Sequence, residues 1–489
     1  MHRSGTDASS WGSGFWDESF DRLRAIAGSV GSSVMAGAGP VGPLFNPLDL
    51  SFRATGGAGV LYWAGSLYAL SDHALPREMN KLTLETVSES AMGGALAGRP
   101  NLVASWKIDT PPGASESADT GDAPANQARR LALLSSQQSG PAAVLSFKEL
   151  DSSGKVVSAT EYTMPGSVAR LVSDFFVTEH YYVVVQPPLS INLERMATRY
   201  TIGDASFAEC VTYEPGQAAK LHLIPRGRGG KGGSVINLPP MVVPRLVQAA
   251  ELGSNQIAID VVAQKGLHYH KDMGDSLPGF YKGQPKPELM RVVVDTSAGI
   301  AAAPVVLSHR ATELGVHAAA PKAGAARLSS VLFAAASASE DRENWGPPQV
   351  VTKLRVPTDY CVPDASKPAA GMEPLLPCSR VGAARAGVTS ETWRAGPRAY
   401  LGPLTLVPKA VQNAEDDVWV VTTVHTAGSA HGELIVLDGA QLQAGPVCSV
   451  QLPHALPFPR ALTWVPRYLG PGRTAPAGWK PRVATRVQQ

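Results

Sequence analysis

The sequence has 489 residues, of which 44% are hydrophobic, and a formal net charge of +2. The length and apolar content suffice for a large buried core, while so small a charge gives no field to attract nucleic acid. No apolar run reaches the roughly 18 residues of a membrane-spanning helix. The many glycines and prolines, 48 and 40, are spread along the chain, which indicates frequent turns and not disorder.

The N-terminal segment, residues 1–54, is predicted to be helical and irregular. Over residues 14–35, five apolar residues fall near one face of a helix: Phe15, Phe20, Leu23, Ile26 and Val30. The segment has no apolar signal-peptide core and carries early acidic residues, in which transit peptides are poor. We therefore predict no targeting segment.

Residues 55–470 predict an all-β domain, followed by an irregular tail over 471–489. Short runs rich in β-branched or aromatic residues recur between turn signals: Gly59–Gly65, Ala143–Phe147, Tyr181–Val185, Gln256–Val262, Leu289–Asp295, Val418–Val424 and Glu433–Asp438. Their spacing is typical of a propeller, sandwich or barrel, although no crisp repeat is visible. The polar stretches 110–130, 225–234 and 363–398 are predicted to be loops between strands.

The four cysteines are Cys210, Cys361, Cys378 and Cys448, and none belongs to a C-x-x-C pair. This spacing argues against a zinc ribbon and against a disulfide-rich secreted domain. Cys361 and Cys378 flank a proline-rich loop, so a bridge between them stays an alternative to the favoured interpretation of reduced thiols.

Three further patterns favour structural interpretations over chemical ones. His268 and His270 have the spacing of a metal-binding pair, but their surroundings are typical of a loop. The basic run Arg226–Gly233 resembles segments that bind RNA, but it does not fit the phosphate-binding P-loop pattern, and a flexible loop is favoured. Asp416 and Asp417 are interpreted as a strand-entry turn instead of a general acid and base.

Motifs spread over residues 55–466 resemble, in the same order, those of one family. Asp174–Glu179 is similar to its H-D-F-A-I-T-E motif, and Glu415–Val421 to its E-D-D-G-Y-L-L motif. The remaining matches are Gly59–Pro76, Thr83–Val87, His222–Arg226, Glu433–Asp438, Val450–Pro453 and Leu456–Pro466. On these residues the sequence is identified as resembling the carotenoid cleavage oxygenases, or carotenoid cleavage dioxygenases, of the plant and algal type.

The resemblance implies a seven-bladed β-propeller with Fe²⁺ on its axis, held by four histidines whose orientation is fixed by three glutamates. It also implies an apolar tunnel in which O₂ cleaves a double bond of a carotenoid or apocarotenoid. Members of this family carry further sequence before the part that residues 14–35 match. The resemblance therefore predicts an incomplete propeller, or a sequence that starts late.

The four family histidines are replaced in this sequence. Aligned motifs place Arg99, Ser173, Arg245 and Ala461 at the ligand positions. Arginine presents only hydrogen-bond donors and stays charged, serine is a weak ligand for iron, and alanine is none.

The positions of the three orienting glutamates are also altered. They align with Asp72, Glu313 and Pro403, of which Glu313 alone keeps the family residue. Since the ligand set is lost, the sequence predicts an iron-free pseudoenzyme with no metal, no cofactor and no catalytic residue. Two alternatives remain: an active dioxygenase with a rearranged metal site, and a decaying gene product without stable function.

The resemblance also sets expectations about partners and location. The expected ligand is a carotenoid or apocarotenoid, with a partner protein as the alternative, and no nucleic acid. The family takes up lipid-soluble substrates through peripheral membrane contact, which is expected here too. The plant-type character of Leu67–Pro76 suggests a plastid, with the cytoplasm as the alternative.

Overall fold

The structure, a computed structural model, describes most of residues 57–465. Outside the described residues lie 1–56, 110–128, 268–280, 319–327, 359–386 and 466–489, with shorter gaps at 73, 99–101, 140, 169–170, 201–203, 228, 230, 253–254, 282–283, 311, 313–314, 340–344, 455, 457–458 and 460. The predicted helix over 14–35 and the predicted domain limits near 54 and 470 therefore lie outside this description.

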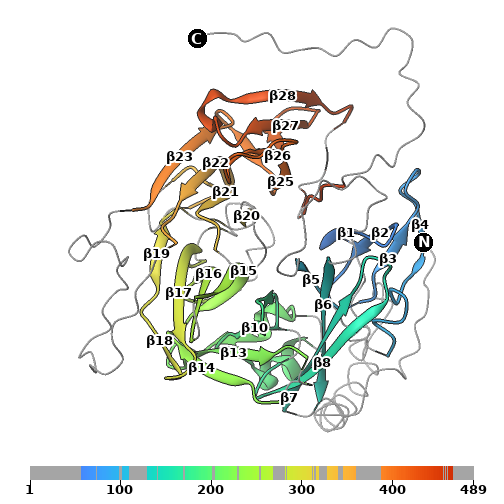
Figure 1. Cartoon of the computed structure of the whole chain (residues 1–489), viewed down its shortest axis with the longest axis vertical. Coiled ribbons are helices and arrows are strands. Elements are labelled where there is room, and N and C mark those ends of the chain that lie inside the picture. Colours follow the sequence, from blue (N-terminus) through green and yellow to red (C-terminus); the bar gives the residue numbers. More distant parts are fainter. Residues whose placement is uncertain are drawn as a thin grey trace, which may run out of the picture.

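Six antiparallel sheets follow one another along the chain and surround a common centre (Figure 1). We number them as blades 1 to 6. The first three are blade 1, with β1 (Gly59–Trp63), β2 (Ser66–Leu70), β3 (Arg77–Met79) and β4 (Thr86–Glu89); blade 2, with β5 (Leu102–Asp109), β6 (Arg130–Ser139), β7 (Ala142–Leu150) and β8 (Val156–Pro165); and blade 3, with β9 (Phe176–Val177), β10 (Tyr181–Gln186), β13 (Ala219–Pro225) and β14 (Ser234–Leu238).

The other three sheets complete the series. They are blade 4, with β15 (Val242–Leu252), β16 (Gln256–Gln264), β17 (Glu288–Asp295), β18 (Ile300–Ala301) and β19 (Val305–Ser308); blade 5, with β20 (Gly315–Ala318), β21 (Val331–Ser337), β22 (Pro348–Arg355) and β23 (Thr389–Arg394); and blade 6, with β24 (Ala399–Leu401), β25 (Thr405–Pro408), β26 (Val418–Thr426), β27 (Glu433–Asp438) and β28 (Pro446–Gln451). Within blade 3, a two-stranded ribbon of β11 (Leu189–Ile191) and β12 (Val211–Tyr213) holds the short helical segments α2 (Leu193–Arg195), η4 (Met196–Tyr200) and η5 (Ala208–Cys210). A further short helical turn, η7 (Leu442–Ala444), lies between β27 and β28.

The predicted all-β propeller is confirmed, with a different blade count. The described residues form six blades, one fewer than the seven that the family resemblance implies. Apart from the ribbon of β11 and β12, every strand that the structure describes between residues 59 and 451 belongs to one of these six antiparallel sheets. The two ends of the series are joined, because Thr463 Oγ1 donates a hydrogen bond of 2.7 Å to the carbonyl of Val60 in β1.

Burial explains why the central strand β16 shows as an apolar run in the sequence and the outermost strand β23 does not. The middle strand β16 is buried at every position except its two ends, because blades 3 and 5 cover its two faces. All seven predicted β-rich runs are strands, and Glu433–Asp438 has the predicted limits. The prediction of a loop over 363–398 is wrong at β23, the outermost strand of blade 5, whose half-exposed polar residues give no apolar pattern.

The hydrophobic core lies between blades. The largest cluster joins blades 3 and 4, and others fill the junctions of blades 1 and 2, 2 and 3, 4 and 5, and 5 and 6. Phe147 of blade 2 stacks on Tyr182 of blade 3 with ring centroids 4.3 Å apart. Since each buried large apolar side chain contributes about 1.5–3 kcal/mol, these junctions are the main source of stability.

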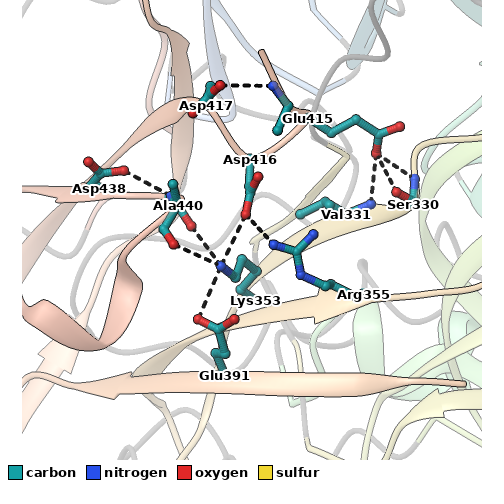
Figure 2. A network of polar contacts seen from close by, with 12 residues as sticks. Ser330, Val331, Lys353, Arg355, Glu391, Glu415, Asp416, Asp417, Asp438 and Ala440 are labelled. Carbon is teal, nitrogen blue, oxygen red and sulfur yellow. Dashed lines mark hydrogen bonds and ion pairs between the residues drawn. The ribbon is translucent and has the colours of Figure 1, made fainter. Parts of the chain in front are cut away.

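Polar contacts also tie each pair of neighbouring blades. In blades 5 and 6, Figure 2 shows the buried Lys353 ammonium contacting Asp416 and Glu391, while Glu415 accepts hydrogen bonds from Ser330 and Val331. The corresponding contacts at the earlier junctions are Trp63 to the Asp151 carbonyl, Arg226 to Asp109 and Glu149, His180 to Glu251, and Gln248 to Ser329.

Two of the patterns noted in the sequence take part in these contacts. Arg226, the first residue of the basic run, is held by ion pairs in the blade 2–3 junction, and the run forms the turn between β13 and β14. Asp417 accepts hydrogen bonds from the backbone of Asn413 and Ala414, so the strand-entry interpretation is confirmed.

Candidate axial site

The inner edges of the blades are formed by the strands that face the centre of the ring. The sheet order places β1, β5, β9, β15 and β20 at the edges of their sheets, and β1, β5, β15 and β20 face the centre (Figure 1). Catalytic or binding groups of such a ring converge here, so the predicted ligand positions are located relative to these strands.

Two of the four positions come together. Ser173 lies three residues before β9, and its hydroxyl donates a 3.4 Å hydrogen bond to the carbonyl of Val243 in β15, two residues before Arg245. The pairing of β15 with β16 is irregular between Val242 and Arg245 and again after Leu246. Such bulges redirect side chains, and here one lies at the inner edge of blade 4.

Asp174 is the centre of this region and connects three blades. Its Oδ1 accepts hydrogen bonds from the hydroxyl of Ser105 in blade 2 and from the backbone N–H of Phe175 at 2.8 Å. Its Oδ2 accepts a 2.8 Å hydrogen bond from the backbone N–H of Leu246 in blade 4. The carboxylate thus locks blades 2, 3 and 4 together at their inner edges.

Lys107 brings a second positive charge to the position of Arg245. Its ammonium lies 3.1 Å from Asp174 Oδ1 and over the ring of Phe176, 5.4 Å from the centroid. Burial lowers the pKa of Lys107; Asp174 opposes this shift, and the positive charge of Arg245 adds to it. We call Ser105, Lys107, Ser173, Asp174 and Arg245 the axial cluster.

The fourth position, Ala461, lies in a segment that passes blade 6 and reaches blade 1. Pro459 packs against Gly402, where an added Cβ would stand 3.0 Å from Pro459 Cγ and would overlap Thr423 Oγ1. Thr463 then bonds to Val60. Ala461 is half-buried, and Pro403, the aligned orienting position, is buried beside Gly402. Neither side chain can ligate a metal or orient an imidazole.

The remaining predicted positions give no further convergence. Asp72 is exposed, two residues after the end of β2. Arg99 and Glu313 lie outside the described residues, as do His268, His270, Cys361 and Cys378. Cys210 and Cys448 are free thiols, the first buried and the second exposed.

The axial cluster does not fit Fe²⁺. Its side chains are two cations, two hydroxyls and one carboxylate whose oxygens are already engaged. Across the described ranges, no three His, Cys, Asp or Glu side chains gather in a way that could hold a metal ion. The buried His222 is occupied by Tyr162 and Gln186, at 3.0 and 2.9 Å.

Sequence reasoning missed Lys107 and the role of Asp174. Asp174 belonged to a matched motif but received no function, and Lys107 lay in a strand that no apolar run revealed. A lysine among the mainly apolar residues of Leu102–Asp109 is the signal that could have identified it.

No helix in the part of the chain that the structure describes is long and apolar enough to cross a membrane.

Comparison with known proteins gives a consistent result. The chain is 24% identical over 417 residues to apocarotenoid-15,15'-oxygenase of Synechocystis sp. (strain ATCC 27184 / PCC 6803 / Kazusa), which covers 85% of this chain and 74% of that protein. It is 25% identical over 440 residues to lignostilbene-alpha,beta-dioxygenase isozyme III of Sphingomonas paucimobilis, covering 86% and 78%.

A solved structure shares the fold. The crystal structure of cobalt-substituted Synechocystis ACO superposes with a TM-score of 0.69 at 22% identity, covering 87% of this chain and 78% of that one. The model of the family described as RPE65, retinal pigment epithelial membrane protein, matches residues 18–466. The chain therefore belongs to the RPE65, or carotenoid oxygenase, family.

Proposed function

We propose that this protein is an iron-free, non-catalytic member of its family that binds a conjugated apolar ligand of the apocarotenoid type. The observation that carries the proposal is the pair of basic side chains, Lys107 and Arg245, on the inner edges of blades 2 and 4 in a ring of six blades. A propeller that keeps its fold but lacks the metal ligands can still bind an organic ligand, but it cannot carry out the iron-dependent cleavage.

Electrostatics argue against a divalent ion beside these residues. At an effective dielectric constant of about 20, a unit charge repels another at about 4 Å by roughly 4 kcal/mol, so a divalent ion would meet roughly twice that from each cation. Asp174 offsets only one of the two positive charges. The replacement of imidazole by guanidinium at position 245 therefore disfavours iron as well as failing to bind it.

The ligand class comes from the relatives. The names of the similar proteins specify an apocarotenoid, isoeugenol and lignostilbene as the compounds on which those proteins act. We propose a ligand of the first class here. Residence in a plastid and contact with a membrane surface are further parts of the proposal, and they rest on the family resemblance alone.

Two measurements on the purified full chain test the proposal. Iron content after anaerobic loading with Fe²⁺ is expected to be far below one ion per chain, and incubation with an apocarotenoid and O₂ is expected to give no cleavage product. Titration of the same apocarotenoid is expected to give a saturable shift of its absorption band.

The opposite results discriminate between the alternatives. Stoichiometric iron together with cleavage would refute the pseudoenzyme proposal and support an active dioxygenase with a rearranged site. Absence of both iron and a spectral shift would remove the apocarotenoid ligand, and failure to show cooperative unfolding would favour a decaying gene product.

A further inference from the structure

The axial cluster carries more positive than negative charge. Lys107 is paired with the carboxylate of Asp174, and the positive charge of Arg245 acts on Lys107 without a carboxylate of its own. The side chain of Lys107 is 19% exposed and that of Asp174 is 6% exposed, while Arg245 is half-buried. The cluster therefore holds one uncompensated positive charge in a partly desolvated place, which is unfavourable unless an anion accompanies it.

Asp174 cannot supply the missing acceptor. Its two oxygens already accept from Ser105, Lys107, Phe175 and Leu246. Within the described parts of the chain, the Arg245 guanidinium has no hydrogen-bond acceptor and no ion-pair partner. Arg245 is thus a planar donor group with its charge unpaired, held beside a second cation.

We infer that Arg245 and Lys107 bind the carboxylate of an acidic ligand at the inner edge of blades 2 to 4. A guanidinium presents two parallel N–H groups that match the two oxygens of a carboxylate, and such charge-assisted pairs are stronger than neutral hydrogen bonds. Ser173 is exposed, and its hydroxyl can donate to the ligand because its bond to the Val243 carbonyl, two residues before Arg245, is long.

The apolar part of this ligand follows from the proposed function, on which this part of the inference rests. A conjugated acid places its carboxylate on Arg245 and leaves its apolar chain for the remainder of the ring. Phe176, which underlies Lys107, offers an aromatic face next to the charged pair. A corresponding alcohol leaves the guanidinium without its acceptor, so the site is expected to discriminate acid from alcohol.

The first experiment tests the carboxylate site without any polyene. ¹³C-labelled acetate is titrated into the full chain, and its line broadening is followed by NMR. Saturable broadening is expected, and R245Q is expected to weaken acetate binding by about tenfold or more because a charge-assisted hydrogen bond is lost. R245K keeps the positive charge but not the two parallel N–H groups of the guanidinium. Its affinity for acetate is expected to lie between those of the wild type and R245Q.

A matched control is R199Q, which removes an exposed arginine paired with Asp204 in another part of blade 3. Its acetate binding is expected to equal that of the wild type. Thermal unfolding of each variant verifies that it folds. Absence of saturable broadening in the wild type, or equal broadening in wild type and R245Q, overturns the inference.

The second experiment compares an apocarotenoic acid with its alcohol by absorbance titration. The wild type is expected to bind the acid about tenfold more tightly than the alcohol, and R245Q is expected to remove that difference. If the protein binds acetate through Arg245 but binds neither polyene, the proposed function is refuted and the carboxylate site is supported. If the wild type and R245Q both bind the acid and the alcohol equally well, the inference is refuted and the proposed function is supported.

Discussion

The ammonium of Lys353, in the strand β22 of blade 5, lies 3.3 Å from the carboxylate of Asp416 in blade 6 (Figure 2). Both side chains are nearly inaccessible, at 1% and 6% exposure, and the ammonium also donates to the carbonyl of Gly439. An ion pair so placed contributes little compared with an apolar pair of the same shape, but each partner depends on the other.

Removal of one partner is therefore expected to be strongly destabilising. We expect K353M to lower the free energy of unfolding by about 3 kcal/mol, since Asp416 then keeps only the half-exposed Arg355 as its cation. Urea denaturation followed by tryptophan fluorescence measures the change. The control R199M breaks the exposed pair with Asp204 and is expected to change stability by less than about 0.5 kcal/mol. Equal losses of unfolding free energy in K353M and R199M would show that the buried pair contributes no more to stability than the exposed pair.

The buried His222 predicts a pH-dependent stability. Burial, aided by the charge of Lys220, lowers the pKa of His222 to about 4, whereas the unfolded chain titrates near its ordinary 6.5. The folded state therefore favours the neutral ring, so this contribution is fully present above pH 6.5 and is lost as pH falls toward 4. The shift corresponds to roughly 3 kcal/mol.

The matched variant is H222Q, which keeps a polar group between Tyr162 and Gln186 but cannot titrate. Its unfolding free energy is expected to vary less than that of the wild type between pH 6.5 and 4. Denaturation midpoints measured at several pH values give the comparison, and parallel curves for the two proteins would count against the assignment.

Gly402 predicts a steric requirement at the segment that contains Pro459 and Thr463, which passes blade 6, reaches blade 1 and is here called the closing segment. A Cβ at this position overlaps Thr423 Oγ1 and crowds Pro459, so we expect G402A to cost about 1–3 kcal/mol. Gly216 has open space around it and no left-handed backbone, and G216A is therefore expected to be neutral or slightly stabilising. Thermal unfolding of both variants tests the difference, which vanishes if the closing segment can shift without penalty.

Metal removal is expected to leave stability unchanged. A ligand that binds the folded state raises stability by mass action, so a resident iron would make the unfolding temperature fall on chelation. With Lys107 and Arg245 at the axis, we expect identical unfolding temperatures with a chelator and with added Fe²⁺. A clear rise with Fe²⁺ would point to ligands that the axial cluster does not contain.

Apolar runs in the sequence predicted several strands of the blades but not all of them. Gln256–Val262 was visible because almost every side chain of β16 is covered. Thr389–Arg394 was not, because an outermost strand meets solvent along most of its length and carries no apolar periodicity.

The candidate site was predictable only in part. Motif alignment gave Ser173 and Arg245, and the structure brings their segments together. Motif alignment could not predict the hydrogen bond from Ser105 to Asp174, which are 69 residues apart. It also could not predict the irregular pairing of β15 with β16. Contacts between blades depend on how whole sheets meet, and no local pattern records that geometry.

The hydrogen bond from Thr463 to Val60 has a consequence for biogenesis. It joins groups that are 403 residues apart, so the two ends of the ring can meet only after nearly the whole chain has been synthesised. The other five blades must be translated before the inner strand of blade 1 can accept this hydrogen bond. A nascent chain is thus exposed to aggregation through its unpaired strand edges for most of its translation time, and chaperones have a long window in which to act.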